Sequence, residues 1–175
     1  VEDIVEDKQQ RLWIAAHTGL HYYNSNNQQF EPYINDSTFA LNLSSEEIFR
    51  IMVDKTNNLW IATLFKGVCV LNQEKKTIEY FLYDKANKKS IRANRVERFY
   101  EDSQGNIWLG TFNAGLKLFD PETKTFKRYL PDPANPYSFR VRSIFEDNNE
   151  NFFVGTRNGL YRLNRKQHLF VYEAN

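Results

Sequence analysis

Paired carboxylates are the residues of this sequence whose type and spacing come closest to catalytic chemistry. They occur as Glu6-Asp7, Glu101-Asp102 and Glu146-Asp147, and Val53-Asp54 breaks the pattern. A glycosidase needs one such pair, but these recur along the chain. An Asp at the end of a strand can instead accept backbone N–H bonds and fix the next turn. We therefore expect a structural role, and no enzyme activity, from Asp7, Asp54, Asp102 and Asp147.

Other chemistry has less support. His17, His21 and His168 are too scattered for a zinc motif, and the Asp-containing turns lack the ligand spacing of a calcium loop. Cys69, the one cysteine, lies in an apolar run and is expected to fill a core. No phosphate-binding, dinucleotide-binding or nucleophile-elbow motif is present. We expect no metal and no cofactor.

The recurring carboxylates belong to an internal repeat. The four Asp residues are 47, 48 and 45 residues apart, and aromatic residues follow each Asp at a constant distance. A self-similar period of this length indicates a repeat architecture. We expect the aromatic anchors to form the core between repeats: Trp13, Trp60, Trp108 and Phe153.

Each repeat resolves into four short strands separated by turn signals. In the third, these are residues 96–102, 107–111, 116–120 and 125–129, and the proline-rich segment 130–139 is not expected to add a strand. The pattern predicts an all-β fold, a β-propeller with four consecutive four-stranded antiparallel blades. The blades are expected at about residues 1–34, 47–82, 95–130 and 140–173.

Four blades are expected to be an arc of a larger propeller, cut from a longer polypeptide, because closure removes exposed sheet edges. A homodimer that closes an eight-blade ring is a second expectation.

Charge is distributed unevenly. Residues 1–87 contain 8 basic and 12 acidic side chains, whereas residues 88–175 contain 15 and 10, and the whole chain has a net charge of +1. The asymmetry indicates either an uneven solvated surface or positive potential toward an anionic partner. A near-neutral chain without a recognition motif excludes nucleic acid, and no apolar run is long enough to contact or cross a membrane.

Variable turns are the candidate binding residues. In a propeller, the turns between the second and third strands lie at the same mouth as the segments that enter each blade, and binding loops vary on a fixed scaffold. Phenyl rings can stack on a sugar, and basic or amide groups can bind hydroxyls or anions. The turn candidates are His17, Phe65, Lys66, Phe112, Asn113, Arg157 and Asn158. The strand starts add Arg50, Arg95, Arg98, Arg140 and Arg142, of which Arg98 and Arg142 are site candidates. They favour an anionic saccharide.

The third repeat, Glu101-Asp102-Ser103-Gln104-Gly105-Asn106-Ile107-Trp108-Leu109-Gly110-Thr111 followed by Gly115-Leu116, resembles the two-component regulator propeller repeat. The resemblance covers the chain in four copies. It implies the periplasmic sensor region of a bacterial, hybrid two-component histidine kinase, whose remaining propeller and kinase domains lie outside this chain. It also implies response to an oligosaccharide or polysaccharide fragment and regulation of carbohydrate-utilisation genes.

Two other functions stay open. The chain can be a protein interaction or dimerisation scaffold without its own ligand site, for which exposed blade faces would argue. A propeller-fold polysaccharide lyase or hydrolase is the third interpretation, and the absence of a unique acid/base pair argues against it.

Overall fold

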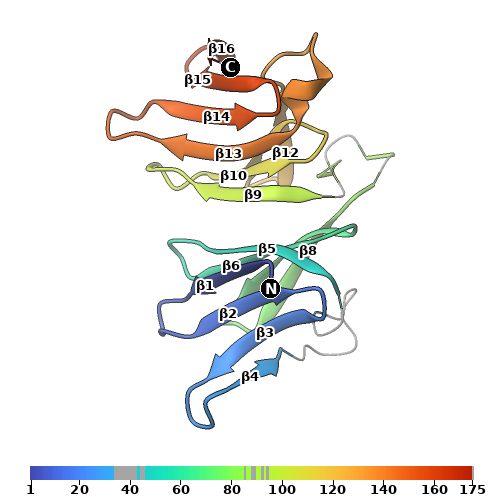
Figure 1. Ribbon diagram of the computed structural model, residues 1–175, viewed down its shortest axis with the longest axis vertical. Coiled ribbons are helices and arrows are strands. Elements are labelled where there is room, and N and C mark those ends of the chain that lie inside the picture. Colours follow the sequence, from blue (N-terminus) through green and yellow to red (C-terminus); the bar gives the residue numbers. More distant parts are fainter. Residues whose placement is uncertain are drawn as a thin grey trace. The chain divides into compact units, whose positions relative to one another are not determined.

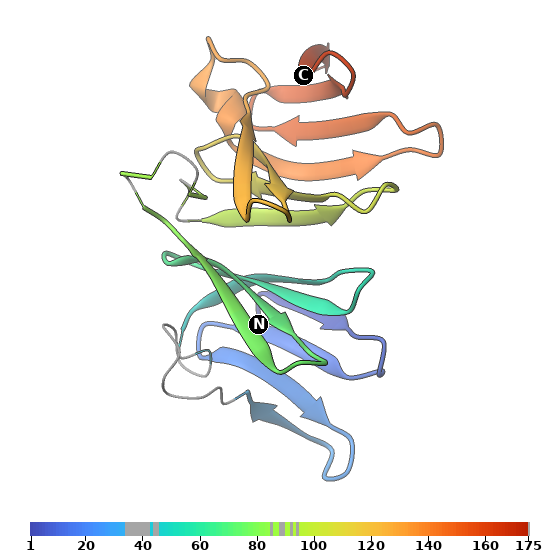
Figure 2. The same cartoon turned by 180° about the vertical axis from the view of Figure 1, so that it is seen from behind.

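The computed structural model describes residues 1–33, 43, 46–84, 86, 87, 90, 91, 93 and 95–174 (Figure 1). The chain divides into two compact units, Val1–Leu82 and Tyr83–Asn175, called unit 1 and unit 2 below. Within the described residues, each unit contains two four-stranded antiparallel sheets whose consecutive strands pair (Figures 1 and 2). The all-β fold and the four propeller blades predicted from the repeats are confirmed. The predicted end of the first blade, residue 34, lies outside the described residues.

Unit 1 contains blades 1 and 2. Blade 1 consists of β1 (Asp3–Glu6), β2 (Leu12–Ala16), β3 (Gly19–Asn24) and β4 (Gln29–Pro32). Blade 2 consists of β5 (Ile48–Val53), β6 (Asn58–Thr63), β7 (Gly67–Asn72) and β8 (Thr77–Leu82).

Unit 2 contains blades 3 and 4. Blade 3 consists of β9 (Val96–Glu101), β10 (Ile107–Thr111), β11 (Leu116–Asp120) and β12 (Thr125–Tyr129). Blade 4 consists of β13 (Val141–Glu146), β14 (Phe152–Thr156), β15 (Gly159–Asn164) and β16 (Leu169–Ala174). The segment between them forms the 3₁₀ helix η1 (Pro136–Phe139), which Asn135 caps by accepting a bond from the Tyr137 N–H. As predicted, it adds no strand.

Left-handed backbone recurs at one position in each of the three turns of a blade. The turn between the second and third strands uses glycine in all four blades, and a Cβ at Gly115 would lie 2.4 Å from the Tyr129 carbonyl oxygen. Glycine is required there by both its positive φ and the close backbone approach. The other two turns mostly use residues with side chains, with φ between 54° and 65° except at Gly105: Gln10, Asn57, Gly105 and Glu150, then Gln28, Lys76, Lys124 and His168.

Aromatic anchors pack between the blades of each unit. Trp13 joins a buried cluster with Leu59 and Ile61 of blade 2 in unit 1. In unit 2, the rings of Trp108 and Phe152 lie 4.8 Å apart, so blades 3 and 4 share one apolar core. Trp60 is also buried.

Phe153 is less buried than the other three aromatic anchors. It is half-buried, while its neighbour Phe152 is fully buried. Successive side chains of a strand point to opposite faces. Phe152 faces the core shared with blade 3, so Phe153 lies on the other face of blade 4.

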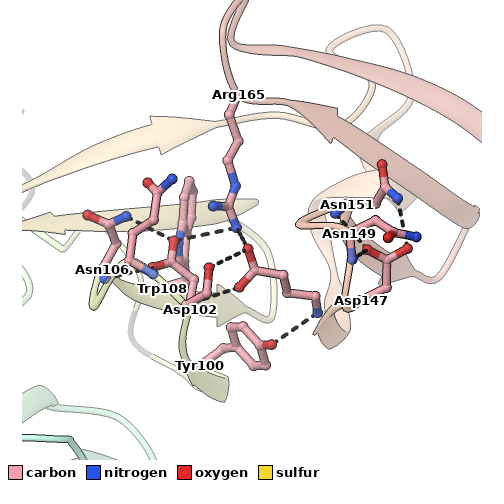
Figure 3. A network of polar contacts seen from close by, with 11 residues as sticks. Tyr100, Asp102, Asn106, Trp108, Asp147, Asn149, Asn151 and Arg165 are labelled. Atoms are coloured by element: carbon pink, nitrogen blue, oxygen red, sulfur yellow. Dashed lines mark hydrogen bonds and ion pairs between the residues drawn. The ribbon is translucent and has the colours of Figure 1, made fainter.

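The Asp at the end of the first strand organises the following turn and the core aromatic. Asp102 accepts hydrogen bonds from the backbone N–H groups of Gln104 (3.1 Å) and Asn106 (2.8 Å) and from the Asn106 side-chain amide (2.9 Å) (Figure 3). It also accepts one from the indole N–H of Trp108 at 2.8 Å. The same indole bond joins Trp13 to Asp7 (2.9 Å) and Trp60 to Asp54 (2.8 Å).

Blade 4 has the turn but not the indole. Asp147 accepts bonds from the backbone N–H groups of Asn149 and Asn151 and from the Asn151 amide, but Phe153 has no donor to offer (Figure 3). The Asn151 amide, followed by backbone N–H bonds, lowers the pKa of the Asp147 carboxyl. A carboxylate with a lowered pKa stabilises the fold above the ordinary carboxyl pKa, and this contribution is lost as the pH falls through the lowered value.

A guanidinium links the two blades of unit 2 at these turns. Arg165, which directly follows β15 in blade 4, places Nη2 2.6 Å from Glu146 Oε1 and 3.6 Å from Asp102 Oδ2 (Figure 3). Its guanidinium carbon also lies 4.9 Å from the centre of the Phe152 ring. Glu146 in turn accepts the Ser103 N–H of blade 3 at 2.7 Å. The carboxylate of blade 3 thus meets a cation supplied by blade 4.

Unit 1 makes a corresponding link, but its arginine belongs to the same blade as the Asp, and the neighbouring blade supplies a glutamine. Arg11 of blade 1 donates to Asp7 of the same blade at 2.9 Å and to Gln73 at 2.5 Å. Gln73 directly follows β7 and therefore holds the place in blade 2 that Arg165 holds in blade 4. Each unit thus places one guanidinium beside a buried Asp. In unit 1 it comes from the blade that carries the Asp, and in unit 2 it comes from the neighbouring blade.

We expect replacement of Asp102 to destabilise unit 2 strongly. Asp102→Ala leaves the buried Trp108 indole and two turn N–H groups without acceptors, which should lower the free energy of unfolding by about 3 kcal/mol. Asp147→Ala is the matched control because its turn is the same but has no buried indole. Denaturant unfolding followed by tryptophan fluorescence and circular dichroism measures both. Equal losses for the two variants would contradict the role assigned to the indole bond.

Candidate functional site

The turns predicted to bind ligand lie beside the segments that enter the blades. In three blades the start of the first strand pairs with the end of the second, as in Val96 with Thr111 and Val141 with Thr156. The first turn residue then donates its N–H to the carbonyl before the first strand: Leu64 to Glu47, Phe112 to Arg95, and Arg157 to Arg140. Each unit therefore gathers its candidate residues at one end of its blades.

Unit 2 brings arginines and aromatic rings together at this end. The guanidinium carbons of Arg95 and Arg140 lie 5.3 Å and 4.4 Å from the centre of the Phe112 ring. The Arg157 guanidinium lies 5.0 Å from the centre of the Tyr137 ring, and its backbone N–H donates to Arg140. We call Arg95, Phe112, Arg140, Arg157 and Tyr137 the arginine–aromatic row. Cations over aromatic faces are attracted by the ring quadrupole, so each ring orients its arginine.

One buried carboxylate anchors the row. Glu97 is 6% exposed and accepts two bonds from Arg140, at 3.1 Å and 3.2 Å, while Arg95 Nε lies 3.4 Å away. The pairing between β9 and β10 shifts register at this point. Such a bulge turns a side chain away from the regular strand alternation. The corresponding residue of blade 4 is Arg142, so the acid belongs to blade 3 alone within unit 2.

Positive charge remains on the row after this pairing. Glu97 pairs with both Arg140 and Arg95, and the part of the chain that the structure describes places no carboxylate within ion-pair distance of Arg157. Tyr137 is 60% exposed and Phe112 is 39% exposed. The row therefore presents aromatic surface and excess positive charge to solvent, the combination that suits an anionic ligand with apolar faces.

The remaining candidates of unit 2 lie outside the row's contacts. Asn113 is exposed in the turn of blade 3, and the Asn158 amide donates to the Tyr161 hydroxyl at 2.9 Å. Arg98 and Arg142 are exposed, and Arg98 donates to the Glu97 carbonyl.

The equivalent end of unit 1 is acidic. The two ring nitrogens of His17 lie 2.9 Å from Glu47 and 3.0 Å from Glu2, and Lys66 pairs with Glu46 at 2.5 Å. Phe65 is exposed beside Lys66. The cations predicted to bind ligand in unit 1 are thus already compensated by carboxylates, unlike Arg157 in unit 2.

Sequence reasoning did not identify Glu97 or Tyr137. The position of Glu97 in the row depends on the register shift between β9 and β10, which no residue type in the sequence indicates. Tyr137 follows Asn135-Pro136, a pair that favours the start of a turn, and this was the available signal.

Cys69 lies in the core, as expected from the sequence. Cys69 is fully buried, and this burial raises the pKa of its thiol to about 12, so the reactive thiolate is disfavoured. Among the described residues, no group of three His, Cys, Asp or Glu side chains is arranged to hold a metal ion. The same residues include no helix with the length and apolarity needed to span a bilayer.

Comparison with known families identifies the repeat. Residues 42–65 and 90–113 match the family described as two component regulator propeller. These segments include the first and second strands of blades 2 and 3. These two segments match the repeat of this family, which confirms the resemblance seen in the sequence. No curated protein matches the chain.

Solved structures share the fold over nearly the whole chain. An extracellular domain from B. thetaiotaomicron, assigned to a one component system in one structure and to a hybrid two component system in another, has a TM-score of 0.78 and 24% identity, over 99% of this chain and 24% of that one. Another from the same organism, assigned to a hybrid two component system, has a TM-score of 0.65 and 22% identity, over 96% and 29%. This chain therefore spans about a quarter of the length of these structures.

An enzyme also shares the fold. A catalytically inactive virginiamycin B lyase from Staphylococcus aureus has a TM-score of 0.68 and 12% identity, over 98% of this chain and 54% of that one. Blades of this kind carry different functions, so function must be argued from the site.

We expect the imidazole of His17 to titrate above its ordinary value of 6.5, because a hydrogen bond to Glu47 and the charge of Glu2 favour the protonated ring. The stabilisation from this ion pair is complete below the unfolded pKa and is lost as the pH rises through the raised value. An NMR titration of the ring protons measures the midpoint. Glu47→Gln should move it down toward 6.5, and a midpoint at or below 6.5 in the unaltered chain would refute the arrangement.

Proposed function

We propose that this chain is part of the extracytoplasmic sensor region of a two-component signalling protein, and that unit 2 binds an anionic oligosaccharide at the arginine–aromatic row. The observation that carries the proposal is the row itself, in which exposed rings lie beside guanidinium groups and Arg157 has no carboxylate within ion-pair distance among the described residues. The family repeats and the extracellular domains among the structural neighbours support a sensor role.

The chemistry of the row fits a saccharide that carries sulfate or carboxylate groups. The apolar C–H face of a sugar ring can pack on Phe112 or Tyr137, while a guanidinium binds an anionic oxygen pair in a bidentate manner. Glu97 holds Arg140 and Arg95 in place before any ligand arrives, which reduces the ordering cost of binding. In this proposal the ligand regulates carbohydrate-utilisation genes through a histidine kinase outside this chain, and the domain is periplasmic.

A scaffold function is the second candidate, supported by the exposed face of blade 4. Phe145, Phe153, Arg162 and Val171 are paired across its four strands and share one face, and Phe145 is 59% exposed. The equivalent face of blade 3 is covered, because its Trp108 packs on Phe152. Light scattering tests whether a second copy covers this face. A monomer at all concentrations would remove the homodimer from consideration.

We expect saturable binding of acidic oligosaccharides that depends on the row. Isothermal titration calorimetry with tetragalacturonate and a heparin-derived tetrasaccharide should show binding that Arg157→Ala and Phe112→Ala each weaken by about tenfold or more. The affinity should fall with added salt because exposed charges are screened. Maltotetraose is the neutral control, because it carries no anionic group for the arginines of the row to bind.

Arg162→Ala is the matched control, since Arg162 is an exposed arginine on the outer face of blade 4 and pairs with Glu173. It should leave the affinity unchanged. Equal weakening by Arg162→Ala would indicate a general charge effect and contradict a site at the row. Release of glycan products during the titration would instead support the lyase or hydrolase interpretation.

A further inference from the structure

Unit 1 contains two adjoining pockets that no part of the proposed function uses. The first has a volume of about 530 Å³, and the described residues that line it are Arg11, Trp13, Tyr22, Glu31, Pro32 and Tyr33. The second has a volume of about 440 Å³ and is lined by Gln9, Arg11, Asn57, Gln73, Glu74 and Lys76. Arg11 borders both pockets, so one elongated ligand can occupy them together.

The first pocket has aromatic walls. The ring of Tyr33 meets Trp13 edge-on at 5.3 Å, and the ring of Tyr22 lies 6.1 Å from Trp13 at a tilted angle. Tyr22 and Tyr33 are half-buried, so each keeps part of its surface accessible while its neighbours hold it in place. Rigid amphipathic rings supply apolar contact area at low entropic cost.

The charged groups that line this pocket have hydrogen-bond partners within the protein. Arg11 pairs with the buried Asp7 at 2.9 Å. Glu31 accepts hydrogen bonds from the Tyr22 hydroxyl (2.7 Å) and from the side-chain amides of Asn24 (3.0 Å) and Asn27 (2.7 Å). Both groups therefore already have partners within the protein, which a neutral ligand leaves in place.

The second pocket is dominated by neutral amides. The Asn57 amide donates to Gln9 at 2.8 Å, and the Gln73 amide donates to the Asn57 carbonyl at 3.0 Å. The Asn57 oxygen also accepts the Lys8 N–H, and the Gln73 oxygen accepts a bond from Arg11. Each side-chain amide nitrogen has two N–H donors, so these bonds orient the amides and leave one further donor on Asn57 and on Gln73. Glu74 and Lys76 add one charge of each sign at the exposed margin.

We propose that these two pockets form a binding site for a neutral oligosaccharide chain, with sugar rings stacked in the aromatic pocket and hydroxyl groups bound in the amide pocket. Aromatic walls recognise the apolar face of a sugar, and oriented amides match hydroxyl groups, which both donate and accept. The site lies entirely in unit 1 and does not depend on the arginine–aromatic row of unit 2.

The test titrates the full chain with maltohexaose, cellohexaose and xylohexaose, with a neutral hexapeptide of glycine and serine as the competing class. At least one hexasaccharide should saturate by calorimetry, and Tyr22→Ala and Gln9→Ala should each weaken that binding by about tenfold. The matched controls are Tyr23→Ala, on the opposite face of β3, and Gln29→Ala, exposed on β4; both should leave it unchanged.

Circular dichroism shows whether each variant is folded, and Tyr33→Ala, which removes the other half-buried ring that lines the pocket, replaces Tyr22→Ala if that variant unfolds. Saturation by the peptide alone, no saturation by any hexasaccharide, or equal effects of the pocket and control variants would overturn the proposal. Arg157→Ala should not alter hexasaccharide binding, so failure at this site and failure at the row of unit 2 remain distinguishable.

Discussion

The carboxylate at the end of the first strand is the interaction on which each blade depends. In three blades it accepts backbone N–H groups of the following turn and, through its other oxygen, the indole N–H of the core tryptophan. A tryptophan buried between two sheets needs an acceptor for this N–H, and a charged acceptor makes a stronger bond than a neutral one. One side chain thus fixes the turn, the strand register and the orientation of the largest core residue.

Burying a carboxylate requires compensation, and the two units provide it differently. In unit 1, burial is the largest influence on Asp7 and acts to raise its pKa, yet bonds from Arg11 and Trp13 and the charge of Arg11 hold the pKa of Asp7 below its ordinary value. In unit 2 the guanidinium comes from Arg165 of the neighbouring blade. The cation can therefore belong to either blade of a pair: Arg11 stands four residues after Asp7, whereas blade 3 has Asn106 at that position and Arg165 of blade 4 supplies the charge.

The repeat made the fold predictable from the sequence, but it did not make the local backbone conformation predictable. The strands of blade 3 lie where the sequence predicted them, except that β9 ends one residue earlier, because turn residues and an aromatic anchor bracket each strand. The left-handed positions at Gln10, Glu150 and Lys124 carry no glycine to reveal them. The half-burial of Phe153 depends on which face a neighbouring blade covers, and Glu97 enters the row through a register shift. Both features depend on contacts between strands, which cannot be predicted from the type of a single residue.

The same carboxylates explain why one end of each blade is structural and the other end is variable in sequence. At the end that carries the Asp, charged groups are committed to turns, indoles and links between blades, so substitution there threatens the fold. At the other end, a glycine with positive φ closes the turn, and the residues before it are free to differ: His17 in blade 1, Phe65 in blade 2, Phe112 in blade 3 and Arg157 in blade 4. In unit 1, His17 and Lys66 pair with Glu2, Glu46 and Glu47, whereas in unit 2 the described residues place no carboxylate within ion-pair distance of Arg157. Since Coulombic attraction toward a ligand depends on the charge left uncompensated, the anion site proposed above lies in unit 2, and the site proposed for unit 1 depends on ring stacking and neutral hydrogen bonds.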